Sequence, residues 1–204
     1  MSKGDTMISL LLAISLGCGS DSTTGDSLEP GADTAEGRGD APRYVPDAED
    51  GQSVVSVEPA RYLGLWYEIA TSPSQQQSAC AGTTAEYSLI DESTIGVTNQ
   101  CYLGSLEGRL NSIEGTARPI DDTFARLLVD LGFGFEAPYT VIDLVETADD
   151  EPYSYATVSA AGFQYWILSR TPQIPDDVYT ELLERLEERG ADSTRLVRTE
   201  QPVD

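Results

Sequence analysis

Histidine is absent from all 204 residues of this chain. Its absence excludes a Ser-His-Asp triad, a Cys-His catalytic pair and every metal site that uses a histidine ligand. It also removes the side chain that most often transfers protons near neutral pH. Any acid-base chemistry would therefore depend on carboxylates, tyrosines or cysteines. We expect no metal and no cofactor.

Basic residues are scarce as well. Lysine and arginine number 12 against 35 aspartates and glutamates, which gives a formal net charge of −23. A nucleic-acid partner is excluded, because its binding needs a basic surface that replaces phosphate counterions. The same charge disfavours direct adhesion to an anionic membrane surface. We interpret the acidity as a solubilising surface, with an acidic docking surface for a partner as the alternative.

A predominantly apolar run, Met7–Leu16, follows a basic residue near the N-terminus. It is too short to span a bilayer and is typical of a secretory signal peptide. The Gly17-Cys18 pair that follows resembles the lipobox of bacterial lipoproteins, with Ser15 in place of the usual leucine. The resemblance implies a lipoprotein signal peptide over residues 1–18 and lipidation of Cys18. An ordinary secreted protein with an unmodified Cys18 is the alternative.

Residues 19–52 are rich in glycine, serine, threonine, aspartate and proline and contain few large apolar side chains. Such a segment cannot bury enough surface to offset the entropy lost on ordering, so we expect a flexible acidic tether. Residues 53–204 remain, a length that suits one folded domain. Acyl chains on Cys18 would anchor the protein stably. By analogy with bacterial sorting, the residues after Cys18 favour the outer membrane, with the domain facing the periplasm.

Cysteine is rare, with three residues in the chain. If Cys18 is lipidated, Cys80 and Cys101 are left as a pair. An exported compartment permits a disulfide between them. Such a bond would stabilise the fold by about 3 kcal/mol in the chain-entropy model. Two buried free thiols are the alternative.

From residue 54 onward, short apolar-polar runs alternate with turn residues. This pattern predicts an all-β fold of antiparallel strands, closed into a barrel or, alternatively, stacked as a sandwich. A barrel of eight strands leaves an interior just wide enough for one small ligand. The predicted strands are 64–71, 83–90, 94–102, 111–119, 125–131, 139–146, 153–159 and 164–169.

One helix is predicted after the strands, over residues 175–190. Its apolar residues Val178, Leu182 and Leu186 recur at helical spacing, Asp176 can cap its start, and a glycine ends it. A single amphipathic helix after eight strands must bury its apolar stripe against the outside of the sheet. Residues 195–200 then read as a short final strand.

The segment Gly64-Leu65-Trp66, with the turn-like run 57–63 before it, resembles the first barrel strand of the lipocalins. The run 165–172, which contains Arg170, resembles their last barrel strand, and several runs between them are similar to the bacterial outer-membrane lipoprotein lipocalins and their apolipoprotein D-like relatives. The resemblance implies an eight-stranded antiparallel up-and-down barrel with one helix outside it. It further implies that Arg170 lies across Trp66 and seals the floor, so that Gly64, Trp66 and Arg170 are structural.

The same resemblance implies a lipid-anchored protein that binds fatty acids, lysophospholipids or similar apolar molecules for storage or transport in the cell envelope. Alternate residues of a strand share a face, so Glu68 and Ala70 are expected to face inward with Trp66. Glu68 would then bond to a ligand headgroup or, alternatively, to an internal tyrosine or asparagine. The residues expected to line the ligand site are Glu68, Tyr87, Asn99, Tyr139, Tyr155 and Trp166.

Two other functions stay open at this point. A small barrel can be packed solid, which would make the protein a structural component of the envelope. An enzyme acting on a lipophilic substrate would need a positioned acid, for which Glu68 and Asp143 are the candidates. The sequence does not define the oligomeric state.

Overall fold

The structure, a computed structural model, describes residues 43–45, 48, 53–72, 80–146, 148 and 150–203. One compact unit spans Pro42–Asp204. Cys18, the signal peptide and most of the expected tether lie outside the described residues. No helix within the described ranges is long and apolar enough to cross a membrane.

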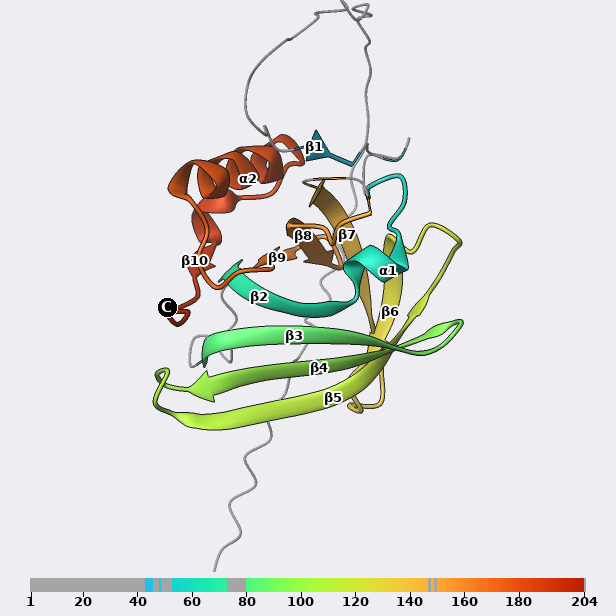
Figure 1. Cartoon of the computed structure of the whole chain (residues 1–204), viewed down its shortest axis with the longest axis horizontal. Helices are drawn as coiled ribbons and strands as arrows, with labels where there is room; N and C mark the ends of the chain where they lie inside the picture. Colours follow the sequence, from blue (N-terminus) through green and yellow to red (C-terminus); the bar gives the residue numbers. More distant parts are fainter. Residues whose placement is uncertain are drawn as a thin grey trace, which may run out of the picture. The chain divides into compact units, whose positions relative to one another are not determined.

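Eight strands form a closed antiparallel barrel (Figure 1). Each strand pairs with the next along the chain, and the pairing of the last with the first closes the sheet. The prediction of an up-and-down barrel is therefore confirmed, and the sandwich alternative is wrong. The strands are β2 (Gly64–Thr71), β3 (Cys80–Asp91), β4 (Thr94–Leu103), β5 (Arg109–Pro119), β6 (Arg126–Asp130), β7 (Glu136–Glu146), β8 (Tyr155–Ala160) and β9 (Gln164–Ser169).

Two short strands extend this sheet. β1 (Arg43–Tyr44) pairs with the end of β7, and β10 (Val197–Arg198) pairs with the end of β2. β10 is the predicted final strand, shorter than the range 195–200. β1 falls within 19–52, so the tether boundary expected at residue 52 is too late. The folded domain includes the strand that begins at Arg43.

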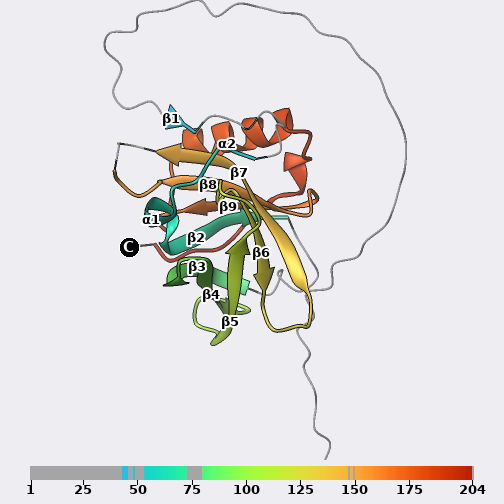
Figure 2. The same cartoon turned by 90° about the vertical axis from the view of Figure 1, so that its right-hand side faces the viewer.

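Two helices accompany the barrel. The short α1 (Pro59–Tyr62) precedes β2, and α2 (Asp176–Glu188) follows β9, with a 3-10 turn at Ser193–Arg195 after it. Leu182 of α2 is fully buried and packs with Ile167 of β9 on the outer face of the barrel, as Figure 2 shows for the helix as a whole. The predicted helix is confirmed.

The start of α2 differs from the prediction. Pro175 is the residue before the first helical turn, and Asp176 lies within that turn, where a carboxylate interacts favourably with the helix dipole. The Asp176 carboxylate also accepts a hydrogen bond from Arg198 of β10 at 2.8 Å. Asp176 therefore ties the helix to the final strand instead of capping it.

The register of the strands separates an inner from an outer face. Residues directly opposite each other in neighbouring strands share a face. The row Trp66–Ala85–Asn99–Ile113 crosses β2 to β5 in this way, and Trp66 belongs to the inner core. On β7 and β8, Leu144 and Ala156 face inward, so the neighbouring pair of Val145 and Tyr155 faces outward.

Cys80 and Cys101 form the predicted disulfide, with their Cα atoms 5.5 Å apart. The bond links the first residue of β3 to β4 at the end of the barrel far from α1. The alternative of two free thiols is therefore wrong. The covalent link ties the start of β3, where the connection 72–79 ends, to the neighbouring strand β4.

Candidate functional site

The floor of the barrel is closed by a cation over an aromatic ring. The guanidinium carbon of Arg170 lies 3.8 Å from the centroid of the Trp66 ring, and Trp66 is fully buried. The indole N–H donates to the carbonyl of Tyr62 at 2.8 Å. A cation over an indole face contributes about 0.5–2 kcal/mol and covers apolar surface as well.

Arg170 also donates to five backbone carbonyls. Burial lowers the pKa of Arg170 to about 10, and the guanidinium remains charged at neutral pH. The N–H groups of the planar guanidinium point in several directions and can reach all of these carbonyls. The single ammonium group of a lysine could not. The acceptors are the carbonyls of Leu65 at 2.7 Å, Arg61 at 2.9 Å, Tyr62 at 3.0 Å, Leu63 at 3.0 Å and Tyr153 at 3.1 Å.

Gly64 begins β2 with a φ of +96°, a conformation that side chains disfavour. A Cβ at this position would lie 3.5 Å from Nη1 of Arg170. The glycine therefore allows the chain to turn from α1 into β2 beneath the guanidinium. These contacts explain why Gly64, Trp66 and Arg170 occur together.

A cluster of three tyrosines lies next to Trp66 inside the barrel. The hydroxyl oxygens of Tyr62 and Tyr139 are 2.6 Å apart, and the Tyr87 hydroxyl donates to that of Tyr139 at 3.1 Å. Burial raises the pKa of Tyr87 to about 12 and raises those of Tyr62 and Tyr139 well above the ordinary value. All three phenols therefore keep their protons at neutral pH.

Three of the predicted lining residues lie on the inner face and are only half-buried. These are Tyr139, Asn99, which shares the inward row of Trp66, and Trp166, which packs against the inner core opposite Val158. Side chains of a solid core would be fully covered. The half-buried aromatic and amide groups instead form a wall, and Trp166 lies toward the end of the barrel far from α1.

Glu68 faces inward, opposite Leu168 of the inner core, and is 6% exposed. Its carboxyl accepts a hydrogen bond from the hydroxyl of Thr199 at 2.5 Å. Burial raises the pKa of Glu68 to about 7. The alternative of an internal hydrogen bond therefore holds, but the partner is a threonine from the C-terminal segment and not a tyrosine or asparagine.

That C-terminal segment completes the barrel wall where β2 and β3 separate, beyond the pair Tyr67–Thr84. The side-chain amide of Gln201 donates to the carbonyls of Glu68 at 2.9 Å and Thr83 at 2.8 Å. Sequence reasoning missed Thr199 and Gln201, because only the tertiary path of the chain after α2 brings them to this gap.

Two sequence expectations about side-chain direction are wrong, and one candidate acid lies outside the barrel. Tyr155 packs beneath α2 on the outer face and does not line the interior. Ala70 also faces outward, because a bulge between Glu68 and Ala70 inverts the alternation. Asp143 is fully buried outside the barrel, where it accepts from Arg185 at 2.6 Å and Arg189 at 2.8 Å, so it is not an acid of the cavity.

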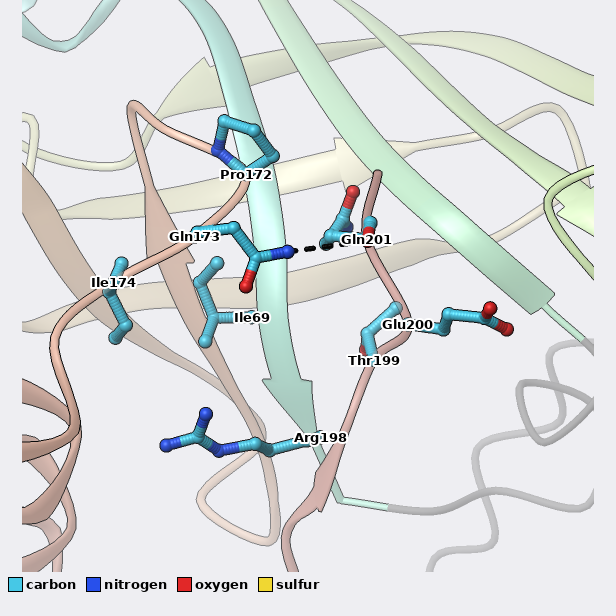
Figure 3. A pocket seen from close by; sticks show the side chains of 8 residues that line it. All are labelled: Ile69, Pro172, Gln173, Ile174, Arg198, Thr199, Glu200 and Gln201. Carbon is cyan, nitrogen blue, oxygen red and sulfur yellow. Dashed lines mark hydrogen bonds between the residues drawn. The ribbon is translucent and has the colours of Figure 1, made fainter. Parts of the chain in front are cut away.

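A separate pocket of about 240 Å³ lies outside the barrel, between the β9–α2 connection and the C-terminal segment (Figure 3). Gln173 reaches across it and donates to the carbonyl of Gln201 at 3.3 Å. Arg198 and Glu200 extend to opposite sides of the pocket in Figure 3. Its lining is largely polar, which suits a small polar molecule better than an acyl chain. The lining residues are Ile69, Pro172, Gln173, Ile174, Arg198, Thr199, Glu200 and Gln201.

Comparison with known proteins identifies the family of this closed barrel with its sealed floor and outer helix. The family described as lipocalin-like domain matches residues 57–201. The chain belongs to the lipocalin family. Members of this family bind small hydrophobic molecules in the barrel, so the inner face described above is the candidate site.

Known lipocalins cover most of the chain. A protein of Acanthamoeba polyphaga mimivirus named as a lipocalin is 39% identical over 151 residues, which are 70% of this chain and 84% of the viral protein. The outer membrane lipoprotein Blc of Vibrio cholerae is 34% identical over 155 residues, covering 75% and 88%. The structure of insecticyanin from Manduca sexta shares the fold, with a TM-score of 0.58, 20% identity and coverage of 79% and 88%.

Arg170→Ala should reduce the free energy of unfolding by about 2–4 kcal/mol, because it uncovers Trp66 and removes the donor of several backbone carbonyls. Arg170→Lys should lose less, since a lysine retains the charge over the ring. Urea unfolding followed by tryptophan fluorescence measures both. An unchanged stability in Arg170→Ala, combined with lost ligand binding, would contradict the structural role.

Glu68 should make stability depend on pH. Its pKa is about 7 in the folded protein against 4.5 ordinarily, so the folded state holds this proton more tightly. The resulting stabilisation, on the order of 3 kcal/mol, is complete below pH 4.5 and is lost as the pH rises through 7. Glu68→Gln keeps the size of the side chain and removes this dependence.

The measurement is the difference in unfolding free energy between wild type and Glu68→Gln from pH 4 to 8. Taking the difference cancels the contributions of the other carboxylates. Relative to the variant, wild type should lose stability across this range. Parallel curves for the two proteins would mean that the pKa of Glu68 is the same in the folded and unfolded states.

Proposed function

We propose that this lipocalin binds fatty acids, lysophospholipids or similar apolar molecules inside its barrel, and that it stores or transports them in a bacterial cell envelope. The observation that carries this proposal is the inner face. Its aromatic and amide groups are only half-buried within a barrel whose floor is sealed by Arg170. Apolar walls with a few polar groups are the usual lining of small-molecule sites.

The two other functions receive less support. A solid structural barrel would bury Asn99, Tyr139 and Trp166 completely, whereas each keeps part of its surface exposed. An enzyme would need a positioned acid facing the ligand. Asp143 lies outside the barrel in ion pairs, and Glu68 is engaged with Thr199. Lipocalins are generally binding proteins, and we propose the same for this chain.

The chain has two tryptophans, Trp66 and Trp166, so its fluorescence reports on the barrel. Titration of the purified protein with fatty acids and lysophospholipids should quench this fluorescence saturably, with one ligand per protein and micromolar or tighter affinity. Trp166→Phe should remove most of the quenching. Trp166 lies on the wall of the barrel, where it can contact the ligand, whereas Trp66 lies behind the tyrosine cluster of the floor. No saturable response across chain lengths, in a folded and ligand-free protein, would favour the solid barrel.

The membrane location is a separate part of the proposal. The similarity to outer membrane lipoproteins and the Gly17-Cys18 motif together support a lipid anchor on Cys18 at the outer membrane. The anchored domain would face the periplasm and exchange ligands with the membrane beside it.

Cys18→Ser should move the protein from the membrane fraction to the soluble fraction when it is expressed in a bacterium with a lipoprotein pathway. Mass spectrometry should find a diacylglyceryl group on Cys18 of the wild-type protein and none on the variant. Cys80→Ser serves as a control, because it removes a cysteine without touching the lipobox. Equal membrane association of wild type and Cys18→Ser would exclude the anchor.

A further inference from the structure

The tyrosine cluster at the barrel floor has one hydroxyl proton that takes part in no hydrogen bond within the cluster. Three phenol groups carry three O–H protons. The two contacts among them, Tyr62 with Tyr139 and Tyr87 with Tyr139, use two of these protons. Among the described residues, no further acceptor contacts these hydroxyls. One O–H of the cluster is therefore available to a group outside it.

The cluster offers a hydrogen-bond donor to a ligand, because its phenols stay protonated. Burial raises the pKa of all three phenols, so none of them ionises at neutral pH. The spare donor belongs to Tyr62 or Tyr139, depending on the direction of the 2.6 Å hydrogen bond between them. Tyr139 is only half-buried on the inner face, so the cluster borders the interior of the barrel.

A positive charge lies behind this donor. The Arg170 guanidinium lies 3.8 Å from the centroid of the Trp66 ring, and the tilted ring of Tyr62 follows with its centroid 5.1 Å from that of Trp66. All hydrogen bonds of Arg170 within the described part of the chain go to backbone carbonyls, and none goes to a carboxylate. Its charge is thus not neutralised by a carboxylate and attracts an anion at the floor.

The connections at the opposite end of the barrel, its mouth, carry no positive charge of their own. The connections 72–79, 104–108, 131–135 and 161–163 contain no lysine or arginine. Glu107 and Asp130 lie in or beside them, Arg109 directly follows 104–108, and Glu136 is paired with Arg118 at 2.8 Å. A carboxylate held at this mouth would lie near Glu107 and Asp130, whereas a carboxylate at the floor meets a hydrogen-bond donor and a cation.

We infer that the hydroxyl cluster of Tyr62, Tyr87 and Tyr139 is the headgroup site for the carboxylate of a long-chain fatty acid, which enters head-first and leaves its methyl end at the mouth. This inference rests on the proposed function and narrows its ligand class. A charge-assisted O–H···O⁻ bond is stronger than one to a neutral acceptor, so the site discriminates acids from alcohols and amines of equal chain length.

The test compares hexadecanoate, hexadecanol and hexadecylamine, which share one chain and differ in the head. Wild type should bind the acid at least tenfold more tightly than the amine. Tyr139→Phe removes the hydroxyl that both other tyrosines contact. It should weaken the binding of the acid by about tenfold, which corresponds to the loss of one hydrogen bond. Binding of the alcohol should change less than that of the acid.

Tyr155→Phe is the matched control, because it removes a phenol hydroxyl on the outer face beneath α2. It should leave the affinities for all three ligands unchanged. If Tyr139→Phe fails to fold, as judged by its thermal unfolding, Tyr87→Phe replaces it, since this hydroxyl contributes a single bond to the cluster.

The orientation of the bound fatty acid is measured in a separate experiment. Fatty acids that carry a nitroxide quencher near the carboxyl or near the methyl end are bound to wild type and to Trp166→Phe. The carboxyl-end label should quench Trp66 more strongly, and the methyl-end label should quench Trp166 more strongly. The reverse order, or equal affinities of acid, alcohol and amine in wild type and Tyr139→Phe, would overturn the inference and leave the proposed function intact. Absence of binding for every ligand would instead refute the proposed function.

Discussion

The guanidinium of Arg170, stacked 3.8 Å from the centroid of the Trp66 ring, fixes three separate parts of the chain at once. Its donors reach the α1 turn, the start of β2 and the residue Tyr153 before β8. The carbonyls of Arg61, Tyr62 and Leu63 lie at the end of α1, where the last carbonyls of a helix have no partner within the helix. The position of Tyr62, and with it the hydroxyl cluster, follows from this floor. The structural motif and the candidate site are therefore one assembly.

The C-terminal segment has a similar role at the wall. β2 and β3 separate beyond Tyr67, and the gap is filled by residues that follow β10. Gln201 bridges the two strands through their backbone carbonyls, and Thr199 binds the Glu68 carboxyl. A carboxyl with a pKa near 7 thus lies in the part of the wall that depends on the end of the chain. Burial disfavours the charged form of this carboxyl, whereas the hydrogen bond from Thr199 favours it.

The sequence predicted the strands well, because alternation and turn residues are local signals. It predicted side-chain direction less well. Alternation places Glu68 and Ala70 on one face, but a bulge between them inverts the order, and such bulges leave no sure mark in the sequence. The sequence also leaves the register of β8 undefined, and the expectation that Tyr155 faces inward is wrong for this reason. Thr199 could not be found at all, since its partner Glu68 lies 131 residues away.

A net charge of −23 would by itself repel anionic ligands, but the positions of the charges matter more than their sum. Charges in water are screened within about 8 Å at physiological ionic strength, so acidic residues at the mouth act on groups held at the mouth. Arg170 and the phenols act behind a low-dielectric wall, where each interaction is stronger. An acid that enters head-first passes the acidic mouth once and rests among donors. In the opposite orientation its carboxylate would stay near Glu107 and Asp130, so the charges along the barrel favour the inferred head-first orientation.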